Sequence, residues 1–295
     1  MENISEGKLS NRYKEIILDV FRVFISICEK YDLQYFCCGG TAIGVVRHQG
    51  MIPWDDDIDV LMPRDHYNKF IDLMKRDCPE GFELIDPKTF DHYYLPFAKF
   101  SNNRTTVLEH LNIPCVFGVN IDIFPLDGAN SNRAILERDY QEFKLNANKL
   151  RAVAKTKKDN FNDFFNHLFK FQLRTALNEA RFAFNKKESR AAIWRKIEHI
   201  LMKHDLTSSN FVGNYGGMWG LKEFCPKDWF SKHVNGEFEA MEVKLPGEYD
   251  KLLTQMYGDY MTPPPIEKRQ THHHVAYVDL DKRLTMSEIR NLLKQ

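Results

Sequence analysis

Long hydrophobic runs are missing from this sequence, and so is the layout of a secretory signal. The 295 residues contain no apolar stretch of the roughly 18 residues that a membrane-spanning helix needs. The first residues, MENISEGKLSNRYKE, do not place a basic segment before an apolar one, as signal peptides do. These absences predict an intracellular protein, in the cytoplasm or at the inner face of the cell membrane.

A net charge of either sign is also missing, and cysteine is sparse. The chain has 41 Lys and Arg residues against 41 Asp and Glu residues, so no nucleic-acid partner is expected. There is no CxxC pair, and the adjacent Cys37 and Cys38 cannot easily form a disulfide with each other. We therefore predict reduced, buried thiols at all six positions: Cys28, Cys37, Cys38, Cys78, Cys115 and Cys225.

The sequence divides into three parts, and none of them contains an internal repeat. Residues 1–130 mix helical and strand patterns and are expected to form the core domain. Residues 131–210 have the composition of a basic helical insertion or subdomain. Residues 211–295 contain a hairpin, a short helix and a C-terminal arm, which are expected to complete the core domain.

Alternating helix and strand patterns fill the first part. They predict a helix over residues 12–33, a strand over 34–40, and a short helix over 41–48 that has Thr41 as its N-cap and stops at Gly50. Further expected elements are a strand at 58–62, a helix at 63–77, and strands at 82–86, 96–101, 105–109 and 116–128.

The remaining parts give weaker patterns. Residues 133–205 carry 17 Lys or Arg against 9 Asp or Glu, with phenylalanines at roughly helical spacing between 161 and 171. We interpret them as helices with a solvated basic face, and the alternative is a peripheral contact with a membrane surface. Later in the chain, Asn235-Gly236 predicts a hairpin turn. A helix is expected between Pro246 and Gly258, followed by a proline-rich extended arm over 260–277.

Four aspartates crowd into five positions directly before a predicted buried strand: Asp55, Asp56, Asp57 and Asp59. In an extended segment Asp56 would point away from the other three. Packing like charges is unfavourable unless a cation compensates them, and Mg²⁺ takes one or two carboxylates together with substrate phosphates. We therefore predict metal ligands at Asp57 and Asp59, with Asp55 as a further candidate. A solvated turn after Pro53 would explain Asp55 and Asp56, but not Asp59 among its apolar neighbours.

Gly39, Gly40 and Thr41 precede this acidic segment by one short helix. Two glycines at the end of a strand let the backbone approach a phosphate, and the N–H groups at a helix start attract anions. These residues are therefore candidates for phosphate binding. The alternative is a tight turn without a ligand.

A third carboxylate is predicted at Asp122. In VNIDIF, Val119, Ile121 and Ile123 alternate with the residues around Asp122, as in a strand with one well-buried face. An unpaired carboxylate there would be costly, so sharing a metal ion with the upstream aspartates is the expected solution. Asp127 is interpreted as a cap or turn residue.

Basic residues could line a bound pyrophosphate, and the candidates are Arg47, Lys99 and Arg269. Each is also a candidate for an ordinary surface charge. Three consecutive histidines begin at His272. No zinc site is predicted there, because only alternate residues of an extended arm share a face and no cysteine is nearby.

Three segments of this sequence together resemble one known family. They are YFCCGGTAIGVVRHQGMIPWDDDIDVLMPRDHYNKF, then IDIFPLDG, then YGDYMTPPPIEKRQTHH. The family is LicD, whose animal relatives include fukutin and the fukutin-related protein. The resemblance implies a nucleotidyltransferase-like α/β (α+β) fold, in which a mixed sheet carries flanking helices and a helical insertion or subdomain. Residues 133–215 show no segment that matches.

The resemblance also implies roles for individual residues. Gly40 and Thr41 would contact the phosphates of the donor, Asp57 and Asp59 would hold Mg²⁺ (or Mn²⁺), and Asp122 would be the third acid. His272 or His273 becomes a candidate contact for a phosphate or for the acceptor, beside a structural or surface role.

The implied activity is the transfer of a phospho-substituent, typically phosphocholine, from a CDP-linked donor to a hydroxyl of a cell-surface glycan. The acceptor could also be a lipid-linked precursor of such a glycan, and CMP would be released. Some relatives use CDP-alditols instead. Two alternatives stay open: a strict nucleotidyltransferase that transfers NMP from an NTP, and a non-catalytic nucleotide-binding scaffold of the same fold.

Overall fold

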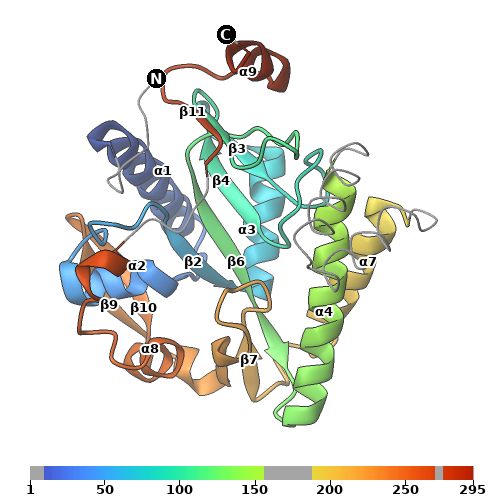
Figure 1. Ribbon diagram of the computed structural model, residues 1–295. Coiled ribbons are helices and arrows are strands. Elements are labelled where there is room, and N and C mark those ends of the chain that lie inside the picture. Colours follow the sequence, from blue (N-terminus) through green and yellow to red (C-terminus); the bar gives the residue numbers. More distant parts are fainter. Residues whose placement is uncertain (1–9, 156–187, 270–274, 295) are drawn as a thin grey trace.

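The computed structural model describes residues 10–155, 188–269 and 275–294 (Figure 1). The predicted phenylalanine pattern between 161 and 171 lies outside the described residues, and so do His272 and His273. Within the described ranges, no helix is both long and apolar enough to cross a membrane.

One mixed sheet organises the molecule, and β6 (Asn120–Ala129) is its central strand. It runs parallel to β2 (Asp59–Pro63) and antiparallel to β4 (Ala98–Asn102). On the outside, β1 (Phe36–Cys37) pairs with β2, and β3 (Phe82–Ile85) pairs with β4. The predicted mixed α/β fold is therefore confirmed.

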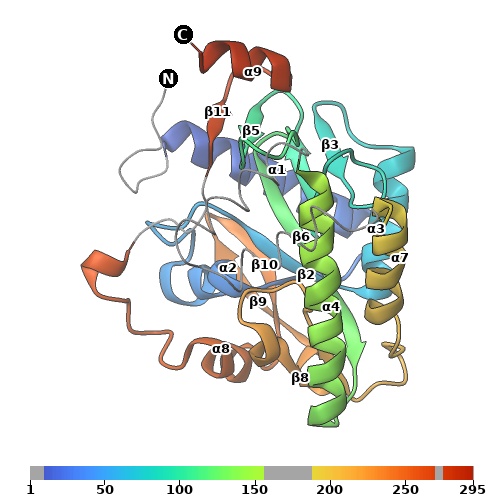
Figure 2. The ribbon, with the colours of Figure 1, turned by 45° about the vertical axis from the view of Figure 1, so that its right-hand side comes forward.

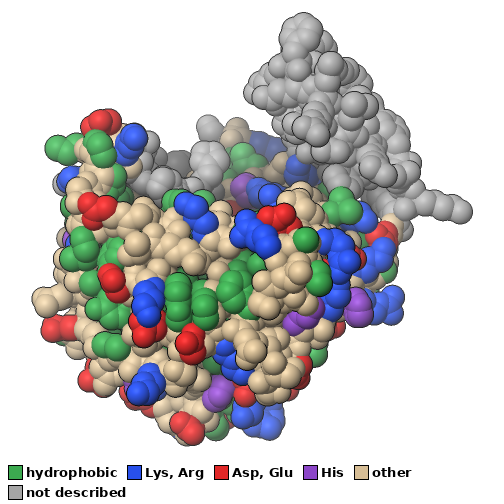
Figure 3. Space-filling view, turned by 90° about the horizontal axis from the view of Figure 1, so that it is seen from below, with side chains coloured by type: hydrophobic (Ala, Val, Ile, Leu, Met, Phe, Trp, Pro, Cys, Tyr) green, Lys and Arg blue, Asp and Glu red, His purple; other side chains and the backbone are tan. Residues whose placement is uncertain are grey.

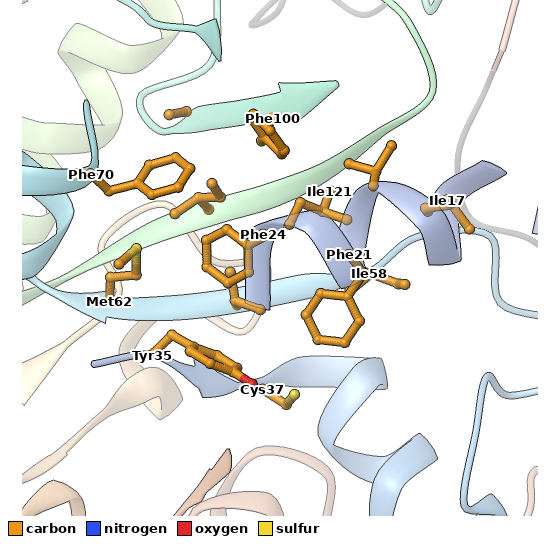
Figure 4. Close-up of a cluster of buried hydrophobic side chains, with 14 of the residues drawn as sticks. Ile17, Phe21, Phe24, Tyr35, Cys37, Ile58, Met62, Phe70, Phe100 and Ile121 are labelled. Carbon is orange, nitrogen blue, oxygen red and sulfur yellow. The ribbon is translucent and has the colours of Figure 1, made fainter. Parts of the chain in front are cut away.

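Two helices, α1 (Asn11–Lys30) and α3 (Arg64–Arg76), pack on one face of this sheet, and both were predicted. Ser10 caps α1, because its side chain accepts a hydrogen bond from a backbone N–H of the first turn. The apolar stripes of the two helices meet in the core, where the rings of Phe24 and Phe70 lie 5.3 Å apart (Figure 4). Because the two helices cover this face, the functional site lies on the opposite face of the sheet.

The helical part lies beside the sheet (Figure 2). There α4 (Arg133–Ala154) and α7 (Arg190–Leu201) lie against each other. The last residues of β6 pair with β7 (Phe211–Gly213), and β7 pairs with β8 (Phe224–Pro226). Buried side chains of these helices and strands form a common hydrophobic cluster.

The face seen from below carries acidic and basic side chains side by side (Figure 3). Lys and Arg are more frequent toward its right-hand side, where Figure 1 places α4 and α7. This distribution agrees with a chain that is neutral overall and has one basic helical part.

The remaining elements are short and surround the core. They are α2 (Gly39–Ile43) with the π-helical η1 (Gly44–His48), β5 (Thr106–Leu108), η2 (Gly220–Glu223), η3 (Lys227–Phe230), β9 (His233–Phe238), β10 (Met241–Pro246), α8 (Tyr249–Tyr257), η4 (Ile266–Lys268), β11 (Tyr277–Asp279) and α9 (Met286–Leu292). The strands β9 and β10 form a hairpin, and β11 pairs with β5.

The predicted hairpin exists, but the prediction of its turn at Asn235-Gly236 was wrong. Both residues lie inside β9, and the turn is made by Glu239 and Ala240, which have φ angles of 50° and 61°. A Cβ atom on Gly236 would lie 2.4 Å from a methyl carbon of Val45. The glycine therefore permits close packing against η1 and does not make a turn.

Two predicted helix starts are also shifted. The short helix expected from Thr41 begins two residues earlier and has Cys38 at its N-cap. The helix expected from Pro246 begins at Tyr249, because Pro246 is the last residue of β10. Its predicted end at Gly258 is confirmed.

The six cysteines are all free thiols, as predicted. Five are buried, and Cys78 is partly exposed. Burial raises the pKa of each thiol, so these side chains are protonated and inert at neutral pH.

Candidate functional site

Polar residues form a row across neighbouring strands of the sheet. Asp59 of β2 is paired with Asp122 of β6, and Asp122 is paired with Lys99 of β4. Beyond Asp59, the backbone N–H of Cys38 donates a hydrogen bond to the carbonyl of Asp59 at 3.1 Å. Paired positions on neighbouring strands place their side chains on the same face. The sheet therefore holds two carboxylates and an ammonium group next to one another.

This row opens into a cavity of about 410 Å³. The cavity brings together five of the residues predicted from the sequence: Gly39, Asp57, Asp59, Lys99 and Asp122. The other predicted residues that the structure describes do not line it; these are Gly40, Thr41, Arg47, Asp55 and Arg269.

Lys99 compensates the charge of Asp122. Its Nζ atom lies 2.6 Å from Oδ1 of Asp122 and 3.3 Å from Oε1 of Glu109, and all three side chains are largely buried. Burial raises the pKa of Asp122, and the charge of Lys99 acts against that rise. Burial alone would lower the pKa of Lys99, but the two carboxylates raise it, so the ammonium group is charged. Asp122 thus has a cationic partner from the protein itself, which the sequence argument did not foresee.

The aspartates before β2 do not alternate as predicted. One carboxylate oxygen from each of Asp55, Asp56 and Asp57 lies within 4.8 Å of the others, a group that could hold a metal ion. The prediction that Asp56 points away was wrong because these residues follow a turn, in which the N–H of Asp55 donates to the carbonyl of Ile52 at 2.9 Å. Strand geometry begins only at Asp59. Carboxylate oxygens are the donors that hard divalent cations prefer.

The Gly39-Gly40-Thr41 segment packs directly against these acids. A Cβ atom on Gly40 would lie 2.3 Å from Oδ2 of Asp55, and one on Gly39 would lie 3.2 Å from Oδ2 of Asp59. Gly39 also has a positive φ of 56°, which glycine adopts without strain. The buried hydroxyl of Thr41 accepts a hydrogen bond of 2.8 Å from the N–H of Asp59. The segment therefore fixes the positions of the acidic residues.

Arg47 and Arg269 lie near each other and close to the residue that precedes the acidic segment. The charge of Arg269 contributes to a lowered pKa of Arg47, after the larger effect of burial. Arg47 donates to the backbone carbonyl of Tyr260 at 2.5 Å. The guanidinium of Arg269 lies 4.9 Å from the ring centre of Trp54, directly before the aspartates. The two arginines form a basic edge beside the acids.

Arg151, on α4, is a cavity residue that sequence reasoning missed. Its guanidinium lies 5.3 Å from the ring centre of Tyr94 and donates to Nε2 of His110 at 2.8 Å. Tyr94 in turn donates a hydrogen bond to Glu109. The helical part therefore contributes a cation to the cavity, and only the packing of α4 beside the sheet reveals it.

Glu223, Tyr257 and Trp219 form another wall of the cavity that sequence reasoning did not assign. Burial raises the pKa of Glu223 to about 7, although the N–H of Trp219 and the side chain of Asn214 donate to its carboxylate and act against this rise. The rings of Trp219 and Tyr257 have their centres 4.6 Å apart. These residues follow the acidic segment by more than 150 positions, so no local motif connects them with it.

Asp127 is not the turn or cap residue predicted from the sequence. It lies in β6, is 1% exposed, and both of its carboxylate oxygens accept hydrogen bonds of 2.6 Å from Arg64. This pair borders a larger cavity of about 840 Å³ at the other end of β2 and β6. His204 of that cavity bonds to Asp139 at 2.9 Å. The charged side chains named at the larger cavity are thus bound to one another within the protein. We therefore take the smaller acidic cavity as the candidate site.

The chain is similar to known proteins over most of its length. The family described as LicD/FKTN/FKRP, nucleotidyltransferase domain, matches residues 32–151. The lipopolysaccharide cholinephosphotransferase LicD of Haemophilus influenzae is 30% identical over 282 residues, which cover 92% of this chain and 99% of that protein. An uncharacterized protein of Rickettsia prowazekii is 30% identical over 59 residues, which cover 20% of this chain and 22% of that protein. An uncharacterized protein of Rickettsia typhi is 34% identical over 76 residues, which cover 25% of this chain and 23% of that protein.

Proposed function

Because this chain belongs to the LicD/FKTN/FKRP family, we propose that it transfers phosphocholine from a CDP-linked donor to a glycan hydroxyl and releases CMP. The observation that carries the proposal is the row of Asp59, Asp122 and Lys99, which shares one cavity with Asp57. Paired carboxylates on neighbouring strands, in a cavity of about 410 Å³, fit metal-assisted phosphoryl transfer.

The residues present fit a divalent metal ion. Asp57, Asp59 and Asp122 line the cavity, and Asp55 stands within reach of Asp57 in the acidic group. Asp57 and Asp59 would hold Mg²⁺, or Mn²⁺ in its place, with Asp55 and Asp122 as further ligands. Such an ion neutralises the charge that develops on the transferred phosphoryl group and on the leaving phosphate.

The side chains of this protein then divide the remaining work. Asp122 accepts the proton of the attacking glycan hydroxyl while the new oxygen–phosphorus bond forms and the bond to CMP breaks. Lys99, at 2.6 Å from Asp122, stabilises that carboxylate as a charged base. If Asp122 is a metal ligand instead, the Nζ atom of Lys99 must move away from the carboxylate oxygen that binds the ion.

Cationic side chains and backbone N–H groups would bind the diphosphate of the donor. Arg151 lines the cavity from α4, and Gly39 lines it at the start of α2, where Gly40 and Thr41 follow. Arg47 and Arg269 stand at the outer edge of the acidic segment, and His272 or His273 would join from the arm that follows Arg269. Together these groups would bind the phosphates of the nucleotide.

The acceptor is a cell-surface glycan or its lipid-linked precursor. The name of the Haemophilus relative states that it acts on lipopolysaccharide. Capsule and teichoic acid are chemically similar acceptors with free hydroxyls. The basic part at residues 133–205 could hold the protein at a membrane that carries such an acceptor.

Product analysis tests the proposal. The protein is incubated with Mg²⁺, lipopolysaccharide and either CDP-choline or CTP, and the released nucleotide is identified. The proposal predicts CMP from CDP-choline and phosphocholine on the glycan. Pyrophosphate from CTP without CMP from CDP-choline would instead indicate a strict nucleotidyltransferase. Failure to bind Mg²⁺ and every cytidine nucleotide would indicate a non-catalytic scaffold.

A further inference from the structure

The wall formed by Trp219, Tyr257 and Glu223 has no task in the transfer chemistry described above. It combines two aromatic rings with one buried carboxylate, and all three side chains line the cavity that holds Asp59 and Asp122. Trp219 is 42% exposed and is one of the residues that line the cavity. The Nζ of Lys222 already lies 5.8 Å from the centre of this ring, which shows that a cation can approach it.

Glu223 is held in place from two sides. The backbone N–H of Trp219 donates to its Oε1 at 2.8 Å, and the side chain of Asn214 donates as well. A Cβ atom on Gly217 would lie 1.9 Å from both carboxylate oxygens, so residue 217 must lack a side chain for Glu223 to occupy this position. The carboxylate is therefore fixed beside the aromatic pair, in a place where its ionised form lacks the solvation of bulk water.

Tyr257 links this wall to the acidic row. A Cβ atom built on Gly39 would lie 3.2 Å from Oδ2 of Asp59 and 3.6 Å from the hydroxyl oxygen of Tyr257. The hydroxyl end of Tyr257 therefore lies near Asp59, and its ring leads from there to Trp219. The aromatic wall and the acidic row therefore adjoin each other within one cavity.

We propose that Trp219, Tyr257 and Glu223 form the site for the quaternary ammonium group of the donor and so select choline over neutral alcohols. This inference rests on the proposed function, because it assumes that a CDP-linked donor binds in this cavity. The rings attract a positive charge through their π faces. Above about pH 7 the ionised carboxylate supplies the opposite charge that a quaternary ammonium group, which has no N–H to donate, requires nearby. A neutral polyol gains nothing from either contribution.

The test is the dissociation constant of each donor, measured by titration calorimetry with Mg²⁺ present. The ligands are CDP-choline, CDP-glycerol, and the CDP ester of dimethylbutanol, in which carbon replaces the charged nitrogen. The wild-type protein should bind CDP-choline about tenfold more tightly than the uncharged isostere, the size expected for a partly desolvated cation–π contact with a nearby charge.

The variants Glu223→Gln and Trp219→Ala should weaken CDP-choline binding about tenfold and leave the binding of CDP-glycerol unchanged. Trp229→Phe and Glu242→Gln are matched controls, since neither residue lines the cavity, and both should behave as the wild type does. Melting temperatures identify a variant that fails to fold. In that case Tyr257→Phe serves as a mild variant: it retains the aromatic ring and should keep the preference for choline.

The possible results separate the two proposals. Equal affinities of the wild type for CDP-choline and its uncharged isostere would overturn the ammonium site while leaving the transferase proposal intact. The ammonium site would also be overturned if Glu223→Gln and Trp219→Ala weakened the binding of CDP-choline and CDP-glycerol to the same extent. If the wild type bound none of the three ligands, the proposed function itself would fail.

Discussion

Asp122 and Asp127 lie on the same strand, both are buried, and each is paired with a basic side chain, yet their surroundings differ. Lys99 lies between two carboxylates, those of Asp122 and Glu109, and faces the acidic cavity. Arg64 binds Asp127 through two hydrogen bonds of 2.6 Å, one to each carboxylate oxygen. The first arrangement leaves Asp122 partly available for chemistry, whereas the second satisfies Asp127 completely.

This difference teaches that burial of a charged pair does not by itself indicate a functional site. A bidentate arginine fixes both carboxylate oxygens, which suits a structural role. Lys99 is shared by two carboxylates and contacts only Oδ1 of Asp122, so Oδ2 of Asp122 can serve a ligand. Four predictions test the comparison.

The largest effect is expected from Asp122→Asn. It removes the proposed base or metal ligand, so CMP release should fall at least about a thousandfold. Stability should change little, because Lys99 keeps Glu109 as its partner. Asp59→Asn should behave alike. Turnover and circular dichroism are measured together, and wild-type turnover in both variants would refute the assignment of the row.

Asp127→Asn should have the opposite profile. It leaves the guanidinium of Arg64 buried without its counter-charge, which typically costs about 3 kcal/mol of unfolding free energy. Denaturant titration measures this loss. The folded fraction should keep its turnover, and a turnover loss as large as that of Asp122→Asn would abolish the distinction between the two ends of β6.

Glu223 extends the comparison to a buried carboxylate that is held by N–H donors. Its pKa of about 7 exceeds the ordinary value of 4.5, so folding takes up a proton between these values. The stability that this proton confers is complete below about pH 4.5 and is lost as the pH rises through 7. Cys38, Tyr140 and Tyr257 face it, and each has a raised pKa and is neutral there.

Glu223→Gln should therefore match the wild type near pH 4.5 and exceed its stability near pH 8 by about 3 kcal/mol. Unfolding curves recorded across this pH range measure the difference. A constant difference at every pH would mean that Glu223 titrates normally in the folded protein.

The smallest effect concerns the metal ion. At ten times its dissociation constant, Mg²⁺ should stabilise the wild type by about 1.4 kcal/mol, and EDTA should reverse this. Asp57→Asn should lose the shift in melting temperature, while Asp127→Asn, which is remote from the acidic group, should retain it. An equal shift in both variants would place the ion elsewhere.

The sequence predicted those features that depend on local pattern. The helices around Phe24 and Phe70 and the strand around Asp122 were recognised because hydrophobic periodicity is a property of neighbouring residues. The acidic segment was recognised because four like charges stand close together in the chain.

Features that depend on distant partners were not predictable. Asp127 appeared to be a turn residue because Arg64, its partner in the fold, is 63 positions away. Gly236 appeared to be part of a turn, although it is required by contact with Val45 of another element. Likewise, Glu223 joins the site only through tertiary packing, so no spacing rule could have selected it.

A crystal structure with CDP-choline and Mn²⁺ would test the central claim most directly, because the anomalous signal locates the ion. The account predicts a peak among Asp57, Asp59 and Asp122, with the diphosphate beside it in the same cavity. An ion and nucleotide bound away from these three carboxylates would contradict the account.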